Sequence, residues 1–188
     1  NTDITKLKVA YVKDLFKRDY YGRSHDSLAL KTFRNMGVEM EAIELPDSIP
    51  VNALNFILNA EAAAAFDKLT RSNRDDELTR QIKNAWPNVF RSARFIPAVE
   101  YIQANRLRRI LMDEVNRLFR DYDVVITPSY GGNQLLMTNL TGHPCVVVPN
   151  GFDEGGHPVS ISSIGNLYRE RPLPALAPAL QHPTEPEH

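Results

Sequence analysis

The sequence has little cysteine and almost no net charge, and it lacks long apolar runs. A single cysteine, Cys145, among 188 residues permits no intrachain disulfide and no cysteine-rich metal site. The 22 basic and 23 acidic residues leave a net charge of -1, so no global field attracts nucleic acid or anionic lipid. No apolar run reaches the roughly 18 residues that a membrane span needs. We therefore expect no nucleic-acid partner and no membrane partner.

The histidines and the first residues give few signs of a bound group or of targeting. The five histidines lack the paired spacing of metal ligands, so we expect no metal site and no cofactor. No charged and then apolar leader is visible, and a lone thiol is compatible with a reducing compartment. The sequence therefore predicts a cytoplasmic protein, in which any signal peptide would lie upstream of Asn1.

A strand, a helix and a second strand are predicted near the start of the chain. Residues 7–12 and 38–45 alternate as strands do. Residues 24–36 have the apolar spacing of a helix, and Gly37 follows its end. Such a unit predicts two parallel strands joined by a right-handed crossover, with the apolar face of the helix packed on the sheet.

Two longer helices are predicted in the middle of the chain. Residues 51–69 place leucines and alanines three and four apart, which is typical of a strong helix. Residues 97–120 begin with a proline that suits a first helical turn and continue with one apolar stripe. Residues 72–90 between them are polar and predict a loop, one short helix and a mobile connection.

Three short strand patterns and a proline-rich segment complete the chain. Residues 123–127, 145–148 and 159–164 predict strands, so we expect an α/β fold in which helices cover a mixed sheet. A length of 188 residues fits one domain. Residues 171–188 contain five prolines, and a proline inside a helix costs about 3 kcal/mol. We therefore expect a short, kinked or frayed terminal helix.

One run late in the chain joins polar residues to a short apolar strand. Pro144 and Pro149 enclose four residues that predict a buried strand, because proline cannot donate a ladder hydrogen bond and marks strand ends. Asn139, Thr141 and His143 stand two residues apart just before it. An extended segment would turn their polar groups to the same side, an arrangement that suits recognition of a polar substrate.

The same run carries a resemblance to a known family. Its Asn-x-x-Gly-x-Pro phrase at residues 139–144 follows an apolar phrase ending in Thr-Pro at residues 123–128 and precedes a Pro-to-Gly strand at residues 158–165. In order and spacing, these phrases resemble the C-terminal half of amidase-signature enzymes. Glu61 and Tyr101 also look like family features. The resemblance thus covers nearly the whole chain and implies a partial amidase-signature fold.

The resemblance also indicates what the chain lacks. Amidase-signature enzymes are known for a Ser, cis-Ser, Lys triad and for a Gly/Ser-rich segment that carries the nucleophile. None of the seven lysines lies near such a segment, so we assign no catalytic residue to this chain. Residues 1–188 are therefore expected to be the C-terminal portion of a single amidase domain, a fragment without the triad segment.

Five residues are candidate substrate contacts. Asn139 has an amide that can both donate and accept, and Thr138 directly precedes it. The alternative is that the Asn139 side chain ties its own loop through backbone hydrogen bonds. Thr127 and Ser129 end a strand, where ligands gather in α/β sheets, and Gly132 follows in what would be a flexible rim. The alternative here is a plain connection after a buried strand.

Several other residues have a structural explanation. Gly142 would supply a backbone conformation that a side chain forbids. Ser160 and Ser162 have no lysine close in sequence and no nucleophile elbow, so alternating polar positions of a strand explain them. Cys145 would share a strand face with His143, but the apolar residues after it favour a buried, inert thiol over a nucleophile.

These observations predict the pocket-shaping portion of an amidase, whose full-length parent would cleave a small-molecule carboxamide through an acyl-serine. The chain alone would be inactive. One alternative is a glutaminase like the amidotransferase A subunit, although Gly132, Asn133 and Gln134 stand where that branch carries an acidic residue. The other alternative is a non-catalytic α/β binding or assembly module. An apolar surface left uncovered would favour self-association.

Overall fold

The computed structural model describes residues 2–130 and 132–181. Its internal contacts divide the chain into two compact units. The first contains Asn1–Asp47 and Leu111–His188, and the second contains Ser48–Ile110. Helix α6 (Ala98–Phe119) contributes residues to both. Among the described helices, none combines the length and the apolar character needed to cross a membrane.

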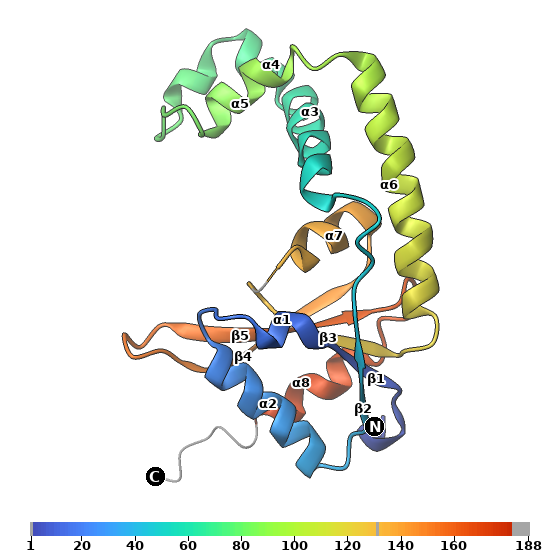
Figure 1. Cartoon of the computed structure of the whole chain (residues 1–188). Coiled ribbons are helices and arrows are strands. Elements are labelled where there is room, and N and C mark those ends of the chain that lie inside the picture. Colours follow the sequence, from blue (N-terminus) through green and yellow to red (C-terminus); the bar gives the residue numbers. More distant parts are fainter. Residues whose placement is uncertain (1, 131, 182–188) are drawn as a thin grey trace. The chain divides into compact units, whose positions relative to one another are not determined.

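The first unit is built on a five-stranded sheet (Figure 1). The pairing shows that β1 is parallel to both β2 and β3, whereas β5 is antiparallel to both β3 and β4. The predicted mixed sheet and the predicted parallel strand-helix-strand unit are therefore confirmed. In spatial order the strands are β2 (Met40–Ile43), β1 (Val9–Val12), β3 (Val124–Pro128), β5 (Pro158–Gly165) and β4 (Cys145–Phe152).

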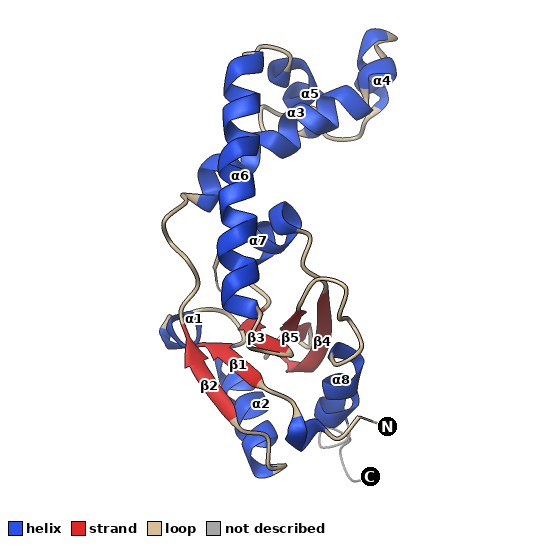
Figure 2. Cartoon of the chain, turned by 90° about the vertical axis from the view of Figure 1, so that its right-hand side faces the viewer, coloured by secondary structure: helices blue, strands red, loops and turns tan. Residues whose placement is uncertain are grey.

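Helices α2 (Arg23–Asn35) and α8 (Leu173–Gln181) pack together against one face of this sheet (Figure 2). Pro178 lies inside α8, where its missing N–H removes one helical hydrogen bond. Of the proline-rich segment, residues 182–188 lie outside the described part of the chain. The core between these helices and the sheet includes Val9, Leu30, Phe33, Val124, Ile126, Ile161 and Leu176.

Two shorter helices flank the strands of the same unit. Helix α1 (Lys13–Lys17) follows β1 directly and contacts β3. Helix α7 (Gln134–Thr141) lies on the side of the sheet opposite α2 and α8 in both views (Figures 1 and 2). It ends at Gly142, whose φ of 80° is left-handed and whose N–H donates to the Thr138 carbonyl at 2.8 Å. This geometry agrees with the backbone role expected for Gly142.

Strand β4 differs from the buried strand that its apolar sequence predicted. It is an edge strand, and its side chains alternate, so that Val147 is 54% exposed whereas Val148 is buried. Cys145 is exposed, and the prediction of a buried thiol is wrong. Pro149 lies inside the strand opposite Ser160, next to a register shift, and does not end it. An edge strand tolerates proline because the missing N–H can face away from the sheet.

The second unit is helical. The single helix predicted for residues 51–69 is wrong, because the chain leaves the helical conformation at Phe66, which stacks on Phe90 at a ring distance of 5.0 Å. Phe90 also packs with Ala63 and Ala93 in the small core of this unit. Its elements are η2 (Val51–Asn55), α3 (Phe56–Ala65), α4 (Asp67–Arg71), η3 (Arg74–Glu77), α5 (Trp86–Ala93) and the first part of α6.

Candidate functional site

Four hydroxyl side chains come from two adjacent strands of the first unit. Thr127 on β3 is paired with Ser162 on β5, and Ser160 stands two residues before Ser162. Ser129 follows the end of β3 directly. Residues two apart on a strand point to the same face. The core residues that alternate with these hydroxyls pack against α2 and α8, so the hydroxyls lie on the other face of the sheet.

Ser129, Ser160 and Ser162 form a hydrogen-bonded group, which we call the serine cluster. Ser129 Oγ lies 2.9 Å from Ser162 Oγ, and the Ser160 hydroxyl donates to Ser129 Oγ at 3.1 Å. Thr127 is fully buried, and its hydroxyl has no hydrogen-bond partner in the described part of the chain. An unpaired buried hydroxyl costs about 1 to 3 kcal/mol. This face is thus more polar than core packing alone requires.

Gln134 anchors the connection between β3 and α7. Its side-chain nitrogen donates to the carbonyls of Pro128 and Ser129, at 2.5 and 3.1 Å. Gln134 is buried, and its Oε1 accepts no hydrogen bond from the residues that the structure describes. Gly132 is exposed in the same connection, and a Cβ there would come within 2.6 Å of a Leu15 methyl. The sequence drew attention to Gln134 only because it is not acidic, and nothing in the local pattern indicated that an amide at the start of a helix would be buried.

Asn139 and Thr138 lie on helix α7 and not in the extended segment that the sequence predicted. Their side chains both donate to the Leu135 carbonyl at 2.9 Å, Thr138 from a buried position and Asn139 from an exposed one. Asn139, Thr141 and His143 therefore do not lie on one side of an extended segment, and the prediction made from their spacing of two is wrong. Side-chain hydrogen bonds to carbonyls of the preceding turn are compatible with a helix. The apolar pattern of the sequence alone did not reveal helix α7.

Thr141, the last residue of α7, and His143 form a buried pair. Thr141 Oγ1 lies 2.8 Å from His143 Nδ1, and the imidazole meets the Phe119 ring edge-on at 5.1 Å. Nε2 has no hydrogen-bond partner among the described residues. Burial lowers the pKa of His143 from 6.5 to about 4, so the ring is neutral at neutral pH. Its polar contact is with Thr141 and not with the serine cluster.

The Cys145 thiol reaches the serine cluster from the edge strand. Desolvation of the thiol raises its pKa, whereas a hydrogen bond with Ser162 acts in the opposite direction. The residue as a whole is exposed, but the balance keeps the thiol protonated at neutral pH. Cys145 and His143 do not form the pair that a shared strand face suggested, since the histidine is buried before the strand begins.

This arrangement is suited to hydrogen bonding more than to nucleophilic chemistry. Within the described residues, the serine cluster bonds to itself and to Cys145, and to no lysine or histidine. A serine acts as a nucleophile only with a base within hydrogen-bond reach. No group of three His, Cys, Asp or Glu side chains in the described ranges could hold a metal ion. The cluster can donate hydrogen bonds to a polar molecule or accept them from one.

Comparison with known proteins gives matches along nearly the whole chain. No family model matches it. It is 24% identical, over 97% of its length, to the A subunit of glutamyl-tRNA(Gln) amidotransferase from Oceanobacillus iheyensis. Over 91% of its length it is 24% identical to a fatty acid amide hydrolase of Arabidopsis thaliana. A solved bacterial aryl acylamidase of the amidase signature family has a TM-score of 0.71 with it, at 16% identity and over 96% of this chain. The chain has an amidase-signature fold.

The resemblance to amidase-signature proteins that the sequence phrases predicted is therefore confirmed. The chain corresponds to only part of the length of these proteins. The chain spans 46% of the amidotransferase protein, 32% of the plant hydrolase and 44% of the aryl acylamidase. Its relatives are amidase-like hydrolases, and the residues that carry the resemblance, from β3 through β5, build the sheet face with the serine cluster.

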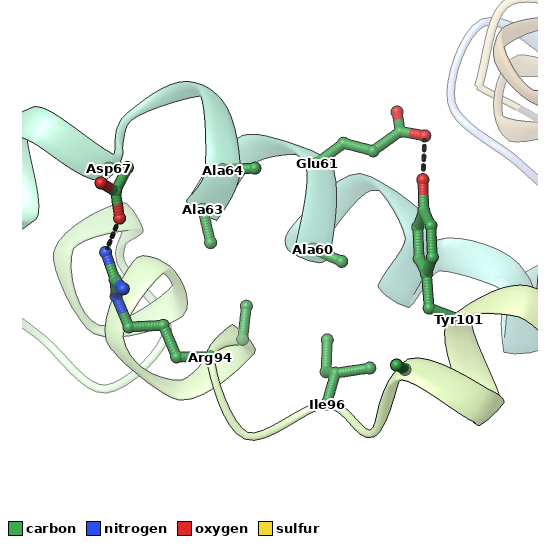
Figure 3. Close-up of a pocket in the computed structure, with 10 residues that line it drawn as sticks. Ala60, Glu61, Ala63, Ala64, Asp67, Arg94, Ile96 and Tyr101 are labelled. Atoms are coloured by element: carbon green, nitrogen blue, oxygen red, sulfur yellow. Dashed lines mark hydrogen bonds and ion pairs between the residues drawn. The ribbon is translucent and has the colours of Figure 1, made fainter.

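Two further residues that looked like amidase-signature features meet in the second unit. The Tyr101 hydroxyl donates to Glu61 Oε1 at 3.0 Å, although the two residues are far apart in sequence (Figure 3). Glu61 lies on α3 and Tyr101 on α6. Their hydrogen bond joins these two helices and forms part of the wall of a cavity.

Proposed function

We propose that this chain is the C-terminal, pocket-shaping portion of an amidase whose full-length parent hydrolyses a small-molecule carboxamide. The proposal is supported by the match of 97% of the chain to less than half of an amidase-like relative. In the parent, the acyl-serine nucleophile and its base would come from polypeptide outside residues 1–188. The chain would contribute sheet strands and one wall of the substrate pocket.

The observation that carries the proposal is a cluster of serines without a base. Hydrolysis of an amide through an acyl-serine needs an activated hydroxyl and donors for the oxyanion. In the serine cluster the hydroxyls bond to each other and to Cys145, and the neutral His143 bonds to Thr141. Hydroxyls without a base within hydrogen-bond reach can hold a polar group in place but are not activated to attack it.

The candidate residues would contribute to this wall in different ways. Asn139 and Gly132 are exposed and would contact the substrate directly. Ser129 would contribute as the member of the serine cluster that is hydrogen-bonded to both Ser160 and Ser162. Thr127 is fully buried opposite Ser162, and Thr138 is buried within α7, so both would act as positioning residues.

The proposal predicts that the isolated chain is inactive and that its serines are unreactive. Incubation with simple aliphatic and aromatic amides should release no more ammonia than a heat-denatured sample. A fluorophosphonate reagent, which modifies activated serines, should leave the mass of the chain unchanged, while a serine hydrolase in the same reaction is labelled. Labelling that is lost in Ser129→Ala, Ser160→Ala or Ser162→Ala would show an activated hydroxyl and overturn the proposal.

A second candidate is the glutaminase portion of an amidotransferase. It is favoured by the match to the A subunit of such an enzyme over 97% of this chain. It is disfavoured by Gly132, Asn133 and Gln134, since none of them offers a carboxylate for the amine of glutamine. We therefore prefer a stand-alone amidase as the parent. Faster ammonia release from glutamine than from simple amides by the full-length parent would reverse this preference.

A further inference from the structure

A cavity of about 530 Å³ lies entirely within the second unit. Its volume falls in the range of about 300 to 1,000 Å³ that is typical of ligand pockets. Most of the lining is apolar, and the side chains are small, so the space between the helices is not filled by the protein itself (Figure 3). The apolar lining consists of Ala60, Ala63, Ala64, Ala93, Ile96 and Ala98.

Two polar contacts bridge the walls of this cavity (Figure 3). Asp67 on α4 forms an ion pair with Arg94, which follows α5. Glu61 on α3 accepts the hydrogen bond from Tyr101 on α6. The alanines of α3 lie between the two bridges. The two bridges therefore join α3 to α6 and α4 to the end of α5 on either side of the apolar lining.

The two carboxylates on the lining have different partners. Two carboxylates, Glu61 and Asp67, face one guanidinium, that of Arg94. Asp67 is also bonded by Arg71 at 2.8 Å, and hydrogen bonds from Arg94 and Arg71 hold the pKa of Asp67 below its ordinary value. In the described part of the chain, the hydrogen-bond partner of Glu61 is the neutral phenol of Tyr101. Among the described residues, Glu61 is therefore the carboxylate of the lining that has no ion-pair partner.

We propose that this cavity binds a small primary amine with an alkyl or aryl body. The ammonium group donates a charge-assisted hydrogen bond to Glu61, and the apolar body lies against the alanines. An apolar lining with one convergent charged group is typical of small-molecule sites. This site is independent of the proposed amidase role, because it lies wholly in the unit that does not contain the serine cluster.

The first experiment compares three probes of equal chain length on the intact chain. Hexylamine, hexanol and hexanoate are titrated in turn by calorimetry, with binding to the second unit located by NMR shifts of alanine methyl groups. Hexylamine is expected to bind about tenfold more tightly than hexanol, because its ammonium group makes a charge-assisted hydrogen bond to Glu61 and the hydroxyl of hexanol carries no charge. Hexanoate should bind more weakly than both. Equal binding of all three probes would overturn the assignment of an amine.

The second experiment uses matched pairs of variants. Glu61→Gln should weaken hexylamine about tenfold and leave hexanol unchanged, because the amide still accepts from Tyr101 but carries no charge. Glu100→Gln removes the same charge from an exposed position of α6 outside the lining and should change nothing.

Filling the cavity gives a test that does not depend on charge. Ala64→Leu should abolish binding of both hexylamine and hexanol, whereas Ala65→Leu, at the exposed neighbour outside the lining, should not. Unchanged binding to Ala64→Leu would overturn the proposed location. Amide hydrolysis enters none of these measurements, so their failure leaves the proposed function untouched.

Discussion

At the scale of single residues, the fold strongly lowers the pKa of His143. This residue is 5% exposed, has one hydrogen bond to Thr141 and has no partner for Nε2 in the described residues. Protonation would place a positive charge in this apolar setting beside Phe119. Burial therefore disfavours the charged form and lowers the pKa of His143 to about 4.

We expect His143 to make the chain less stable in mild acid. The unfolded chain binds this proton with a pKa near 6.5 and the folded chain with a pKa of about 4, so stability present above pH 6.5 is lost as the pH falls toward 4. The loss amounts to about 3 kcal/mol, at 1.36 kcal/mol per pKa unit. Urea unfolding of the wild type and of His143→Gln between these pH values should show it, with a smaller slope in the variant. An imidazole NMR titration with a midpoint near 6.5 would contradict it.

Asp26 has a helix position that the sequence predicted and two hydrogen-bond partners that it did not predict. It lies near the start of the helix expected at residues 24–36 and in the first turn of α2. The sequence did not predict its hydrogen-bond partners. The Asn150 amide, on a strand far along the chain, donates to Asp26 Oδ1 at 2.7 Å, and the Tyr20 hydroxyl donates to Asp26 Oδ2 at 3.0 Å. Burial raises the pKa of Asp26, and these two bonds oppose that effect. Contacts of this range depend on topology, which local patterns do not contain.

At the scale of elements, the helix with the longest apolar stripe was predicted well, whereas the single helix expected at residues 51–69 and the short polar helix α7 were not. The helix expected at residues 97–120 corresponds to α6 (Ala98–Phe119), because its apolar stripe persists over many turns. Helix α7 has only eight residues, and its threonines and asparagine suggested a loop. Strand β4 was correctly found from its valines, but one apolar run cannot distinguish an edge strand from a central one.

Replacement of Gly142 should weaken the end of α7. Gly142→Ala is expected to lower the free energy of unfolding by about 1 kcal/mol, because a side chain disfavours a φ of 80°. The cost is conformational, since a Cβ at this position would meet its nearest neighbour, Leu167, only at 4.0 Å. Gly142→Asn is the matched control, as asparagine tolerates this conformation and should cost less. Denaturant unfolding in which both variants equal the wild type would disprove this role.

At the scale of the whole molecule, the sheet order explains why the candidate site was only partly predictable. The βαβ unit and the strands were visible in the sequence, and Thr127 and Ser129 were singled out as the end of β3. The insertion of β5 between β3 and β4 was not visible, because local patterns do not specify which strands pair. That insertion brings Ser160 and Ser162 to Ser129, so two serines explained as ordinary strand positions become members of the cluster.

The edge formed by β4 leads to a prediction about association of the whole chain. Val147 is 54% exposed and Phe152 is 66% exposed on a strand whose outer side has no neighbouring strand in the described sheet. Uncovered apolar edge strands tend to pair with another chain. We therefore expect light scattering to give a mass above the 21.3 kDa of one chain, increasing with concentration.

Val147→Lys should shift this equilibrium toward the monomer, because a charged side chain on an edge strand opposes pairing with a second edge. Val99→Lys places the same charge at an exposed valine of α6 in the second unit, which does not contain β4, and should leave the mass distribution unchanged. Equal effects of the two substitutions would show that association depends on the solubility of the chain as a whole and not on pairing through β4. A wild-type chain that stays monomeric at all concentrations would remove the argument for β4 as an association surface, since the edge would then be protected by its own twist and by Pro149.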